Sequence, residues 1–582
     1  MMKVTDYIAT FLVENGIDKV FSYIGRNAHI CDSIDKHGEI ENVFTIHEQG
    51  AGFSADSYSR VTGKSGVVTV TSGPGATNIM TPLADCYFDS VPALYIVGDA
   101  PSTECKGSKH IRQFSFQETD MVKIAEEVTK YAVSIKSLKD IRYEFEKAYF
   151  LSQHGRKGPV LISLPENFQF RTDFEPEHEK SFFDSVEYQE LIAKDIMLPS
   201  DKDINALAKL INSASRAVIL VGGGVRLSES TKALTKLLEK TNIPVVYSLM
   251  GKDSISSDYS YNLGFIGNFG TRHANFTIVN SDLLIVLGSR LDNLQTGRDI
   301  KSFVGDAKVV QVDIDKNELG IRVESHLLIQ SDIKTFLEAL NSKKLEPNLS
   351  SWQKKVLEYK KSYPSTYTLD GNDRVGNQLM QKISEHLDDD DVVCVDVGEH
   401  QMLVAQSLDV KKNQRILFSG AFGAMGFALP AAIGATLATG KRAIVITGDG
   451  GLQMNIQELE LIKRRNLPIK ILVINNASLH MVKLRQDTYL EGNLVGSQKD
   501  YSVPSFQKIA EAYGIESYEV TAKEAIDKKI EESLKDNKPE LLDIQISPEM
   551  TTVEPRLDFN REFADMRPHL SREVYAQEML KE

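Results

Sequence analysis

Two polar clusters in the last third of the chain carry the residue types of a magnesium–diphosphate site. Asp449 lies in a Gly-Asp-Gly-Gly sequence directly after one apolar run, and Asn476 closes an Asn-Asn pair directly after another, with 24 residues between Gly450 and Asn475. Carboxylate and amide oxygens suit Mg²⁺, which usually completes its shell with phosphate oxygens and water. Glycines let backbone N–H groups approach a phosphate, and the following helix offers its N-terminus. The spacing therefore predicts a metal-bound diphosphate held between Asp449 and Asn476.

The apolar runs that precede these clusters recur along the chain and predict parallel β-strands. Each run is rich in Val and Ile and is followed by glycine and a helical pattern. Continuous apolar strands that alternate with helices indicate parallel sheets covered on both faces. Polar residues after such strands lie at the carboxyl edge of a sheet, where α/β proteins bind ligands. The expected strands are Val67–Thr71, Ala93–Val97, Val160–Leu164, Val218–Val221, Leu283–Leu287, Val309–Val312, Val392–Val397, Ala443–Thr447 and Ile469–Ile474.

Two segments lack this alternation and predict connections between domains. Residues 168–201 are acidic, aromatic and irregular, and residues 343–373 are polar and contain two prolines. We therefore expect an α/β protein with three doubly wound parallel-sheet domains near residues 1–170, 200–340 and 375–550, followed by a tail at 551–582. The glycine-rich turns Ser72–Ala76 and Ser419–Ala424 resemble each other, which hints that the first and third domains arose by duplication.

The composition excludes several classes of protein. A net charge of −14 argues against a nucleic-acid partner, since phosphate backbones are bound by clustered Lys and Arg. The four cysteines have no CxxC spacing, so neither a disulfide framework nor a zinc site is expected. The N-terminal segment has charges inside its apolar pattern, which predicts a helix rather than a signal peptide. No apolar run approaches the roughly 20 residues of a membrane span, so a cytoplasmic protein is expected.

The sequence around Asp449 and Asn476 resembles the cofactor motif of thiamine-diphosphate enzymes. The resemblance extends over roughly residues 1–550 and is closest to the acetolactate (acetohydroxyacid) synthase branch. In that family a pyrimidine-binding domain, a central domain and a diphosphate-binding domain follow one another, and the three expected domains match that order. Five stretches carry the resemblance outside the metal motif: His47–Ala51, Thr71–Asn78, Phe116–Glu118, Gly420–Pro430 and Gln453–Leu459.

The resemblance implies roles for individual residues. Glu48 matches the glutamate that switches the cofactor's aminopyrimidine to its imino form; from the residues alone, a helix N-terminal glutamate is the alternative. Met425 matches the apolar residue that bends the cofactor, and Gly423 the backbone acceptor for its amino group. The cofactor-binding residues are then Gly25, Gly73, His400, Gln401, Gly423, Met425, Gly448, Asp449, Gly450, Gly451 and Asn476, and the metal-binding residues are Asp449, Asn476 and Ser478. The family builds its site from two subunits, so a homodimer or tetramer is implied, and the sequence does not identify a regulatory subunit.

The chain departs from the synthases near the reacting centre. Arg26 replaces a glycine of the usual Pro-Gly-Gly-Ala turn, and Arg485 aligns with a tryptophan that shapes the second-substrate pocket. Two arginines there would favour a carboxylate or phosphate on the substrate, although ion pairing on the protein surface is the alternative. The expected substrate residues are Arg26, Asn27, Phe116, Gln117, Lys130 and Arg485. The tail resembles synthase-like proteins of bacterial polysaccharide biosynthesis rather than the usual synthase ending.

The central domain carries a candidate FAD site. Its residues are Gly222, Gly223, Gly224, Arg290 and Asp313, but the second arginine of the synthase Arg-Phe-Asp-Asp-Arg segment is absent. A glycine triplet without GxGxxG spacing is a poor match to a nicotinamide site.

The leading hypothesis is a thiamine-diphosphate-dependent enzyme that decarboxylates a 2-oxoacid, with pyruvate as the expected substrate, and joins the remaining fragment to a second carbonyl. The cofactor supplies the electron sink, and the protein supplies position and electrostatics. The alternatives are non-oxidative decarboxylation, acyl transfer to a sugar-derived ketone, and a catalytically silent scaffold or regulatory paralogue.

Overall fold

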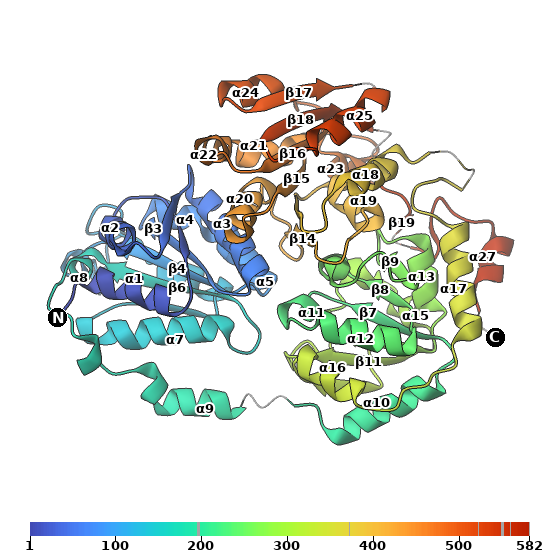
Figure 1. Ribbon diagram of the computed structural model, residues 1–582, viewed down its shortest axis with the longest axis horizontal. Helices are drawn as coiled ribbons and strands as arrows, with labels where there is room; N and C mark the ends of the chain where they lie inside the picture. Colours follow the sequence, from blue (N-terminus) through green and yellow to red (C-terminus); the bar gives the residue numbers. More distant parts are fainter. Residues whose placement is uncertain are drawn as a thin grey trace.

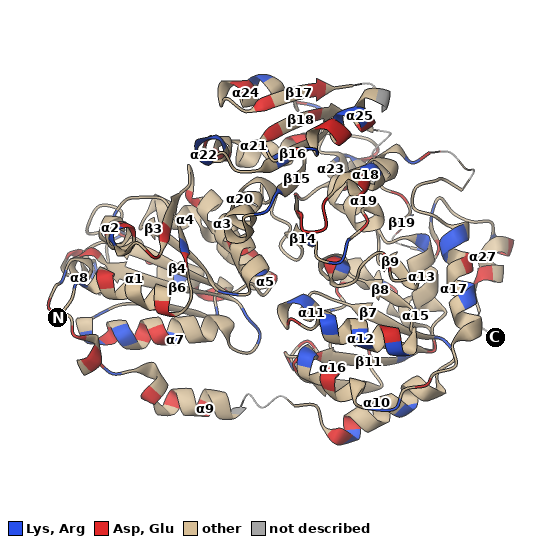
Figure 2. Ribbon diagram, viewed as in Figure 1, with Lys and Arg blue, Asp and Glu red and all other residues tan. Residues whose placement is uncertain are grey.

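A computed structural model shows three parallel six-stranded sheets, each covered by helices (Figure 1). The structure describes residues 1–194, 198–369, 371, 373–521, 523–548, 552–558 and 560–580. This arrangement confirms the α/β class with three doubly wound sheets. No helix in these ranges is long and apolar enough to cross a membrane. Acidic and basic residues are mixed along outer helices such as α7 (Ile141–Gln153) and α25 (Lys523–Ser533), as Figure 2 shows.

The first sheet has the order β2-β1-β3-β4-β6-β5. Its strands β3 and β6 are buried along their whole lengths, as expected of central parallel strands. The strands are β1 (Lys19–Ser22), β2 (Glu41–Phe44), β3 (Gly66–Thr71), β4 (Ala93–Asp99), β5 (Tyr131–Ser134) and β6 (Pro159–Pro165). The helices, with α7, are α1 (Val4–Glu14), α2 (Ala28–His37), α3 (Glu48–Thr62), α4 (Pro74–Asn78), α5 (Met80–Phe88), α6 (Met121–Ala125) and α8 (Glu166–Gln169).

The third sheet, β14-β13-β15-β16-β18-β17, repeats the order of the first when its strands are counted from its own start. The shared order supports duplication, but the two glycine-rich turns are not equivalent, because Ser72 follows a third strand and Ser419 follows a second. The strands are β13 (Val392–Val395), β14 (Arg415–Phe418), β15 (Ala443–Gly448), β16 (Ile469–Asn475), β17 (Glu516–Val520) and β18 (Glu540–Gln545). The helices, with α25, are α18 (Val375–His386), α19 (Glu399–Ser407), α20 (Ala428–Thr439), α21 (Asp449–Met454), α22 (Leu459–Arg465), α23 (His480–Tyr489) and α24 (Phe506–Ala512).

The central sheet, β12-β11-β10-β7-β8-β9, has the strand order of dinucleotide-binding folds. The order reverses between β7 and β10, which are hydrogen-bonded neighbours. The strands are β7 (Ala217–Val221), β8 (Val245–Tyr247), β9 (Asn262–Phe265), β10 (Leu283–Leu287), β11 (Lys308–Asp313) and β12 (Leu327–Gln330). The helices are α10 (Asp201–Ser213), α11 (Gly224–Leu227), α12 (Thr231–Thr241), α13 (Arg272–Val279), α14 (Asn293–Thr296), α15 (Ile300–Val304), α16 (Ile333–Asn341) and α17 (Ser350–Ser362).

Helices α3 and α20 join the first and third domains into one core (Figure 1). Phe53 on α3 meets Phe427, directly before α20, edge to face with ring centroids 5.6 Å apart. A β-carbon on Gly434 of α20 would collide with the carbonyl oxygen of Ser54, so glycine is required for this close crossing. These helices follow the second strand of their sheets, so the two domains pair through equivalent elements.

The two expected connections contain helices. The first includes α9 (Val186–Lys194), and the second contains α17, whose Trp352 is 2% exposed. The Trp352 indole donates to the carbonyl oxygen of Ala217 at 3.2 Å, so α17 belongs to the central domain and is not a linker. The tail, with β19 (Arg556–Leu557), β20 (Met566–Arg567) and α27 (Arg572–Glu578), also packs on that domain, where Phe563 meets Phe303.

Candidate functional site

Asp449 and the residues that contact it lie at the carboxyl edge of the third sheet. Asp449 follows β15 and is 1% exposed, and Asn476 follows the neighbouring strand β16 and is buried. Asp449 Oδ1 accepts from the Tyr501 hydroxyl at 2.7 Å, and Oδ2 accepts from the Ser478 N–H at 3.3 Å. Burial raises the pKa of Asp449, which favours a partner that balances its charge. The Ser478 hydroxyl itself donates to the carbonyl oxygen of Ser497.

His400 supplies a buried donor beside this edge. Its ring lies against Gly448, where a β-carbon would be 3.1 Å from Cε1. His400 Nε2 is buried and has no hydrogen-bond partner among the described residues. Burial lowers the pKa of His400 to about 4, so the ring is neutral at pH 7. In the tautomer that carries its proton on Nε2, this neutral imidazole would donate to a bound phosphate oxygen.

The loop Ser419–Gly426 crosses the same edge. Gly423 has a φ of +71° and is exposed, and the Met425 side chain reaches toward Gly450, where a β-carbon would be 3.3 Å from Cε. Asp396 holds the end of this loop in place, because its carboxylate accepts the N–H of Gly426 at 2.9 Å. Burial raises the pKa of Asp396 to about 6. Gln401 Nε2 donates to the carbonyl oxygen of Ser419 at 3.2 Å.

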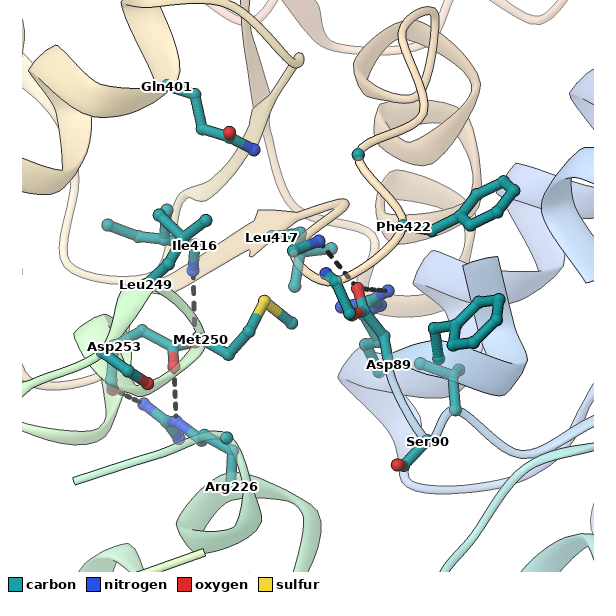
Figure 3. Close-up of a pocket in the computed structure, with 18 of the residues that line it drawn as sticks. Asp89, Ser90, Arg226, Leu249, Met250, Asp253, Gln401, Ile416, Leu417 and Phe422 are labelled. Carbon is teal, nitrogen blue, oxygen red and sulfur yellow. Dashed lines mark hydrogen bonds and ion pairs between the residues drawn. The ribbon is translucent and has the colours of Figure 1, made fainter. Parts of the chain in front are cut away.

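A buried charge cluster fastens the start of this loop to the first domain. Asp89 accepts the N–H groups of Gly420 and Ala421 at 2.9 and 2.8 Å, and Arg60 Nη2 donates to Asp89 at 3.0 Å. Arg60 also binds both carboxylate oxygens of Asp56. In Figure 3, Asp89 lies below the loop, and the side chain of Met250, from the central domain, points toward the start of the loop. All three domains therefore position this loop.

One cavity of about 1380 Å³ connects these parts. Its wall includes Asp449, His400 and Met425, together with Arg60 and Asp89 from the first domain. Central-domain residues of the wall include Gly223, Gly224, Arg290 and Asp313. The volume exceeds the roughly 300–1,000 Å³ of an ordinary ligand pocket. The cavity is thus large enough to hold more than one ligand.

Glu48 lies on a different edge, at the carboxyl end of the first sheet. It is the first residue of α3 and is 7% exposed, and its Oε2 accepts from Asn78 Nδ2 at 2.9 Å. A β-carbon on Gly75 would lie 3.1 Å from Glu48 Oε1, and one on Gly25 would lie 2.6 Å from the side chain of Thr71. The described lining of the large cavity includes none of the following: Gly25, Arg26, Asn27, Glu48, Gly73, Phe116 and Gln117.

The expected substrate residues divide into three groups. Arg26, Asn27, Phe116 and Gln117 lie on the edge that carries Glu48, and Arg26 is paired there with Glu166 at 2.7 Å. Lys130 lies at the opposite edge, where its N–H donates to Pro159 at the start of β6, so one chain does not bring it to Arg26. Arg485 lies on the exposed face of α23, one turn beyond Val482, which lines the cavity.

The glycine triplet of the central domain has a packing role. A β-carbon on Gly224 would lie 2.7 Å from the α-carbon of Gly288, and one on Gly222 would collide with that residue's carbonyl group. The turns after β7 and β10 therefore touch at the point where the strand order reverses. Gly223 and Gly224 still line the cavity, together with Asp313, whose pKa burial raises to about 6.

The sequence did not identify four residues that contact either the edge that carries Asp449 or the edge that carries Glu48. Tyr501 and Asp396 contact the Asp449 edge, and Glu166 pairs with Arg26. Glu458, directly before α22, is 0% exposed and accepts the N–H groups of Ile46 and His47 at 3.2 and 3.0 Å. Burial raises the pKa of Glu458 to about 7. Their contacts join residues far apart in the sequence, and no local spacing signals them.

Comparison with known proteins agrees with this geometry. Residues 2–124 match the family described as "Thiamine pyrophosphate enzyme, N-terminal TPP binding domain", residues 204–340 its central domain, and residues 396–544 its C-terminal TPP binding domain. The chain is 34% identical to acetolactate synthase 1, chloroplastic, of Nicotiana tabacum over 97% of its own length and 84% of that protein. It is 35% identical to the acetolactate synthase large subunit of Lactococcus lactis over 92% of its length and 91% of that protein. The chain therefore belongs to the family of thiamine pyrophosphate enzymes and is similar to the acetolactate synthases within it.

Proposed function

We propose that this protein decarboxylates pyruvate with thiamine diphosphate and Mg²⁺ and joins the remaining two-carbon unit to a second carbonyl compound. The observation that carries the proposal is the Asp449–Asn476 edge within a chain that matches acetolactate synthases over nearly its whole length. The test is product analysis after incubation with pyruvate, thiamine diphosphate and Mg²⁺. Acetolactate with released carbon dioxide supports the proposal, whereas acetaldehyde as the main product indicates simple decarboxylation.

The residues at the Asp449 edge fit a magnesium-bound diphosphate. Asp449 and Asn476 supply two oxygens, and no group of three or more His, Cys, Asp or Glu that could hold a metal occurs among the described residues. An ion there would complete its shell with diphosphate oxygens and water, the usual arrangement for Mg²⁺. His400 Nε2 has no partner among the residues that the structure describes, and in the tautomer that is protonated there it would donate to the same diphosphate. Asp449→Asn should weaken thiamine diphosphate binding by at least about tenfold in magnesium-dependent calorimetry, because it removes a charged ligand.

When bound, thiamine diphosphate acts as an electron sink for the carbon–carbon bond that breaks. The chain's own contribution is position and proton control. Glu48 would hold a proton at its carboxylate against a ring nitrogen, and Asn78 fixes the orientation of that carboxylate. Met425 and Gly423 would fix the shape and orientation of the rings between the two edges. If calorimetry with Mg²⁺ present detects no binding of thiamine diphosphate to the wild-type protein, a catalytically silent scaffold is favoured instead.

The site is completed by a second copy of the chain. Glu48 begins α3, whereas Arg60, near the other end of the same helix, lines the cavity that contains Asp449. Twelve residues of α-helix span about 18 Å. Glu48 is absent from the described lining of its own chain's cavity, and we infer that the corresponding edge of a partner supplies Glu48 there. A homodimer is the smallest assembly that completes both sites.

We further propose that the central half of the cavity binds FAD. The strand order of that domain and the position of Gly223, Gly224, Arg290 and Asp313 at its reversal point support this assignment. The absorption spectrum of the purified protein, before and after addition of FAD, tests it. A spectrum without a flavin band and without change on titration would refute the assignment.

A further inference from the structure

Arg26 joins three separate parts of the first domain. Its Nη1 donates to Glu166 Oε2 at 2.7 Å, and its Nη2 donates to the carbonyl oxygen of Phe116 at 3.0 Å. Arg26 lies in the turn before α2, Glu166 begins α8 directly after β6, and Phe116 lies in the loop between β4 and α6. One guanidinium therefore ties a turn, a strand end and a loop together at the edge that carries Glu48.

The backbone of Arg26 has little freedom to move. Its N–H donates to Thr71 Oγ1 at 3.2 Å, and the buried side chain of Asn27 accepts the N–H of Gly25 at 2.7 Å. The turn also rests on β4, because a β-carbon on Gly98 would lie 2.5 Å from the nitrogen of Asn27. The guanidinium thus extends from a fixed base, and its reach to Glu166 and Phe116 sets the distance between them.

The loop that Arg26 holds presents an aromatic side chain to the surface. Phe116 is 76% exposed, and Gln117 has a φ of +62° and packs its Cβ 3.0 Å from the β-carbon position of Gly73. Glu118 closes the loop by accepting the N–H groups of Lys106 and Phe114 at 2.6 and 2.7 Å. The loop has internal contacts, but its fastening to the sheet edge rests on Gly73 and Arg26.

The charge of Arg26 is already balanced. Its side chain is 21% exposed and its pairing carboxylate lies 2.7 Å away, so an anionic substrate would have to displace Glu166. The Nε–H is buried without a partner in the described part of the chain, so the guanidinium edge that carries Nε is closed to a bidentate approach. This geometry differs from the expectation that Arg26 binds a substrate anion directly.

We propose that Arg26 and Glu166 form an ion-pair latch that positions Phe116 and Gln117 over the Glu48 edge and thereby sets which acceptor the enzyme takes. Arg26 and Glu166 are positioning residues, and Phe116 is the group that meets the acceptor. The effect on acceptors rests on the proposed function, whereas the latch itself is a property of the folded chain.

The first experiment measures hydrogen–deuterium exchange in the full-length protein without cofactor. Glu166→Gln and Arg26→Ala should each speed exchange in residues 111–118 by about tenfold, the population change that 1.4 kcal/mol produces. The double variant should add nothing further, because the two residues act through one contact. Asp173→Asn, which removes the exposed Arg171–Asp173 pair in the same domain, is the matched control and should leave the loop unchanged. Unchanged exchange in both latch variants overturns the proposal.

The second experiment compares a neutral and an anionic acceptor by kcat/KM. A latch predicts that Glu166→Gln and Arg26→Ala change the ratio of kcat/KM for the two acceptors in the same direction, because both variants displace the same loop. A direct anion receptor predicts opposite shifts, because Glu166→Gln frees the arginine and Arg26→Ala removes it. Opposite shifts overturn the latch. If the wild type turns over no acceptor, the proposed function fails, and the exchange experiment still decides the latch.

Discussion

Mixing two inactive variants should restore activity in a defined amount. Glu48→Gln removes the carboxylate proposed to hold the proton, and Asp449→Asn removes the proposed metal ligand. Glu48 and the Arg60 end of α3 lie about 18 Å apart along one helix, and only the Arg60 end lines the chain's own cavity, so the proposed dimer takes the Glu48 of each site from the partner. A hybrid dimer then has one site with both residues intact and one site with neither.

Random pairing of equal amounts makes about half of the dimers hybrid, so the mixture should recover about one quarter of wild-type activity per site. The two chains are co-expressed with different affinity tags, and the hybrid is isolated by sequential purification and assayed for pyruvate consumption. The isolated hybrid should have about half of the wild-type rate, and each homodimer serves as the inactive control. An inactive hybrid with normal cofactor binding in its Asp449-containing subunit would refute the two-chain site.

Three further predictions concern stability and spectroscopy. Asp89→Ala should lower the free energy of unfolding by about 1–3 kcal/mol, because it leaves the N–H groups of Gly420 and Ala421 without their acceptor, while Asp56 still balances Arg60; urea denaturation measures the change, and a loss under about 0.5 kcal/mol contradicts it. Glu458 has an ordinary pKa of 4.5 that burial raises to about 7, so the folded state holds a proton that the unfolded chain releases, and stability falls as pH rises through that window. Glu458→Gln should therefore shrink the difference in unfolding free energy between about pH 5 and pH 8 by about 3 kcal/mol, and parallel pH profiles for the two proteins would disprove the titration. Trp352, the single tryptophan, should emit at short wavelength and shift to the red only when the central domain unfolds; a red-shifted native spectrum would contradict its burial.

The sequence predicted the parts of the fold that depend on local pattern. Runs such as Ile469–Ile474 are buried on both faces, so their composition alone marks them as central strands. Short or partly exposed strands such as β5 and β12 escaped, since the apolar run in each is only three residues long. The helix α17 was predicted as a linker because its many lysines make the segment polar, although one face of the helix carries the buried Trp352.

The residues of the candidate site also fall into two sets: those whose proximity follows from their spacing in the sequence, and those that only the folded chain brings together. Asp449 and Asn476 sit at strand ends, where sequence spacing translates directly into proximity. Tyr501 reaches Asp449 across 52 residues, and Glu458 reaches Ile46 across 412, so only the folded chain brings these pairs together. The sequence marked Arg26 as unusual, but its pairing with Glu166 depends on how the turn crosses the sheet edge.

The repeated strand order of the first and third domains indicates how the functional residues came to lie on two different domains. Two domains that share an order and pair through equivalent helices are the expected descendants of one ancestral domain that once paired with a copy of itself. One of these domains now carries the carboxylate of Glu48, and the other carries the oxygens of Asp449 and Asn476. In the proposed dimer, inheritance from a self-pairing ancestor would account for a reaction centre that draws on two polypeptides.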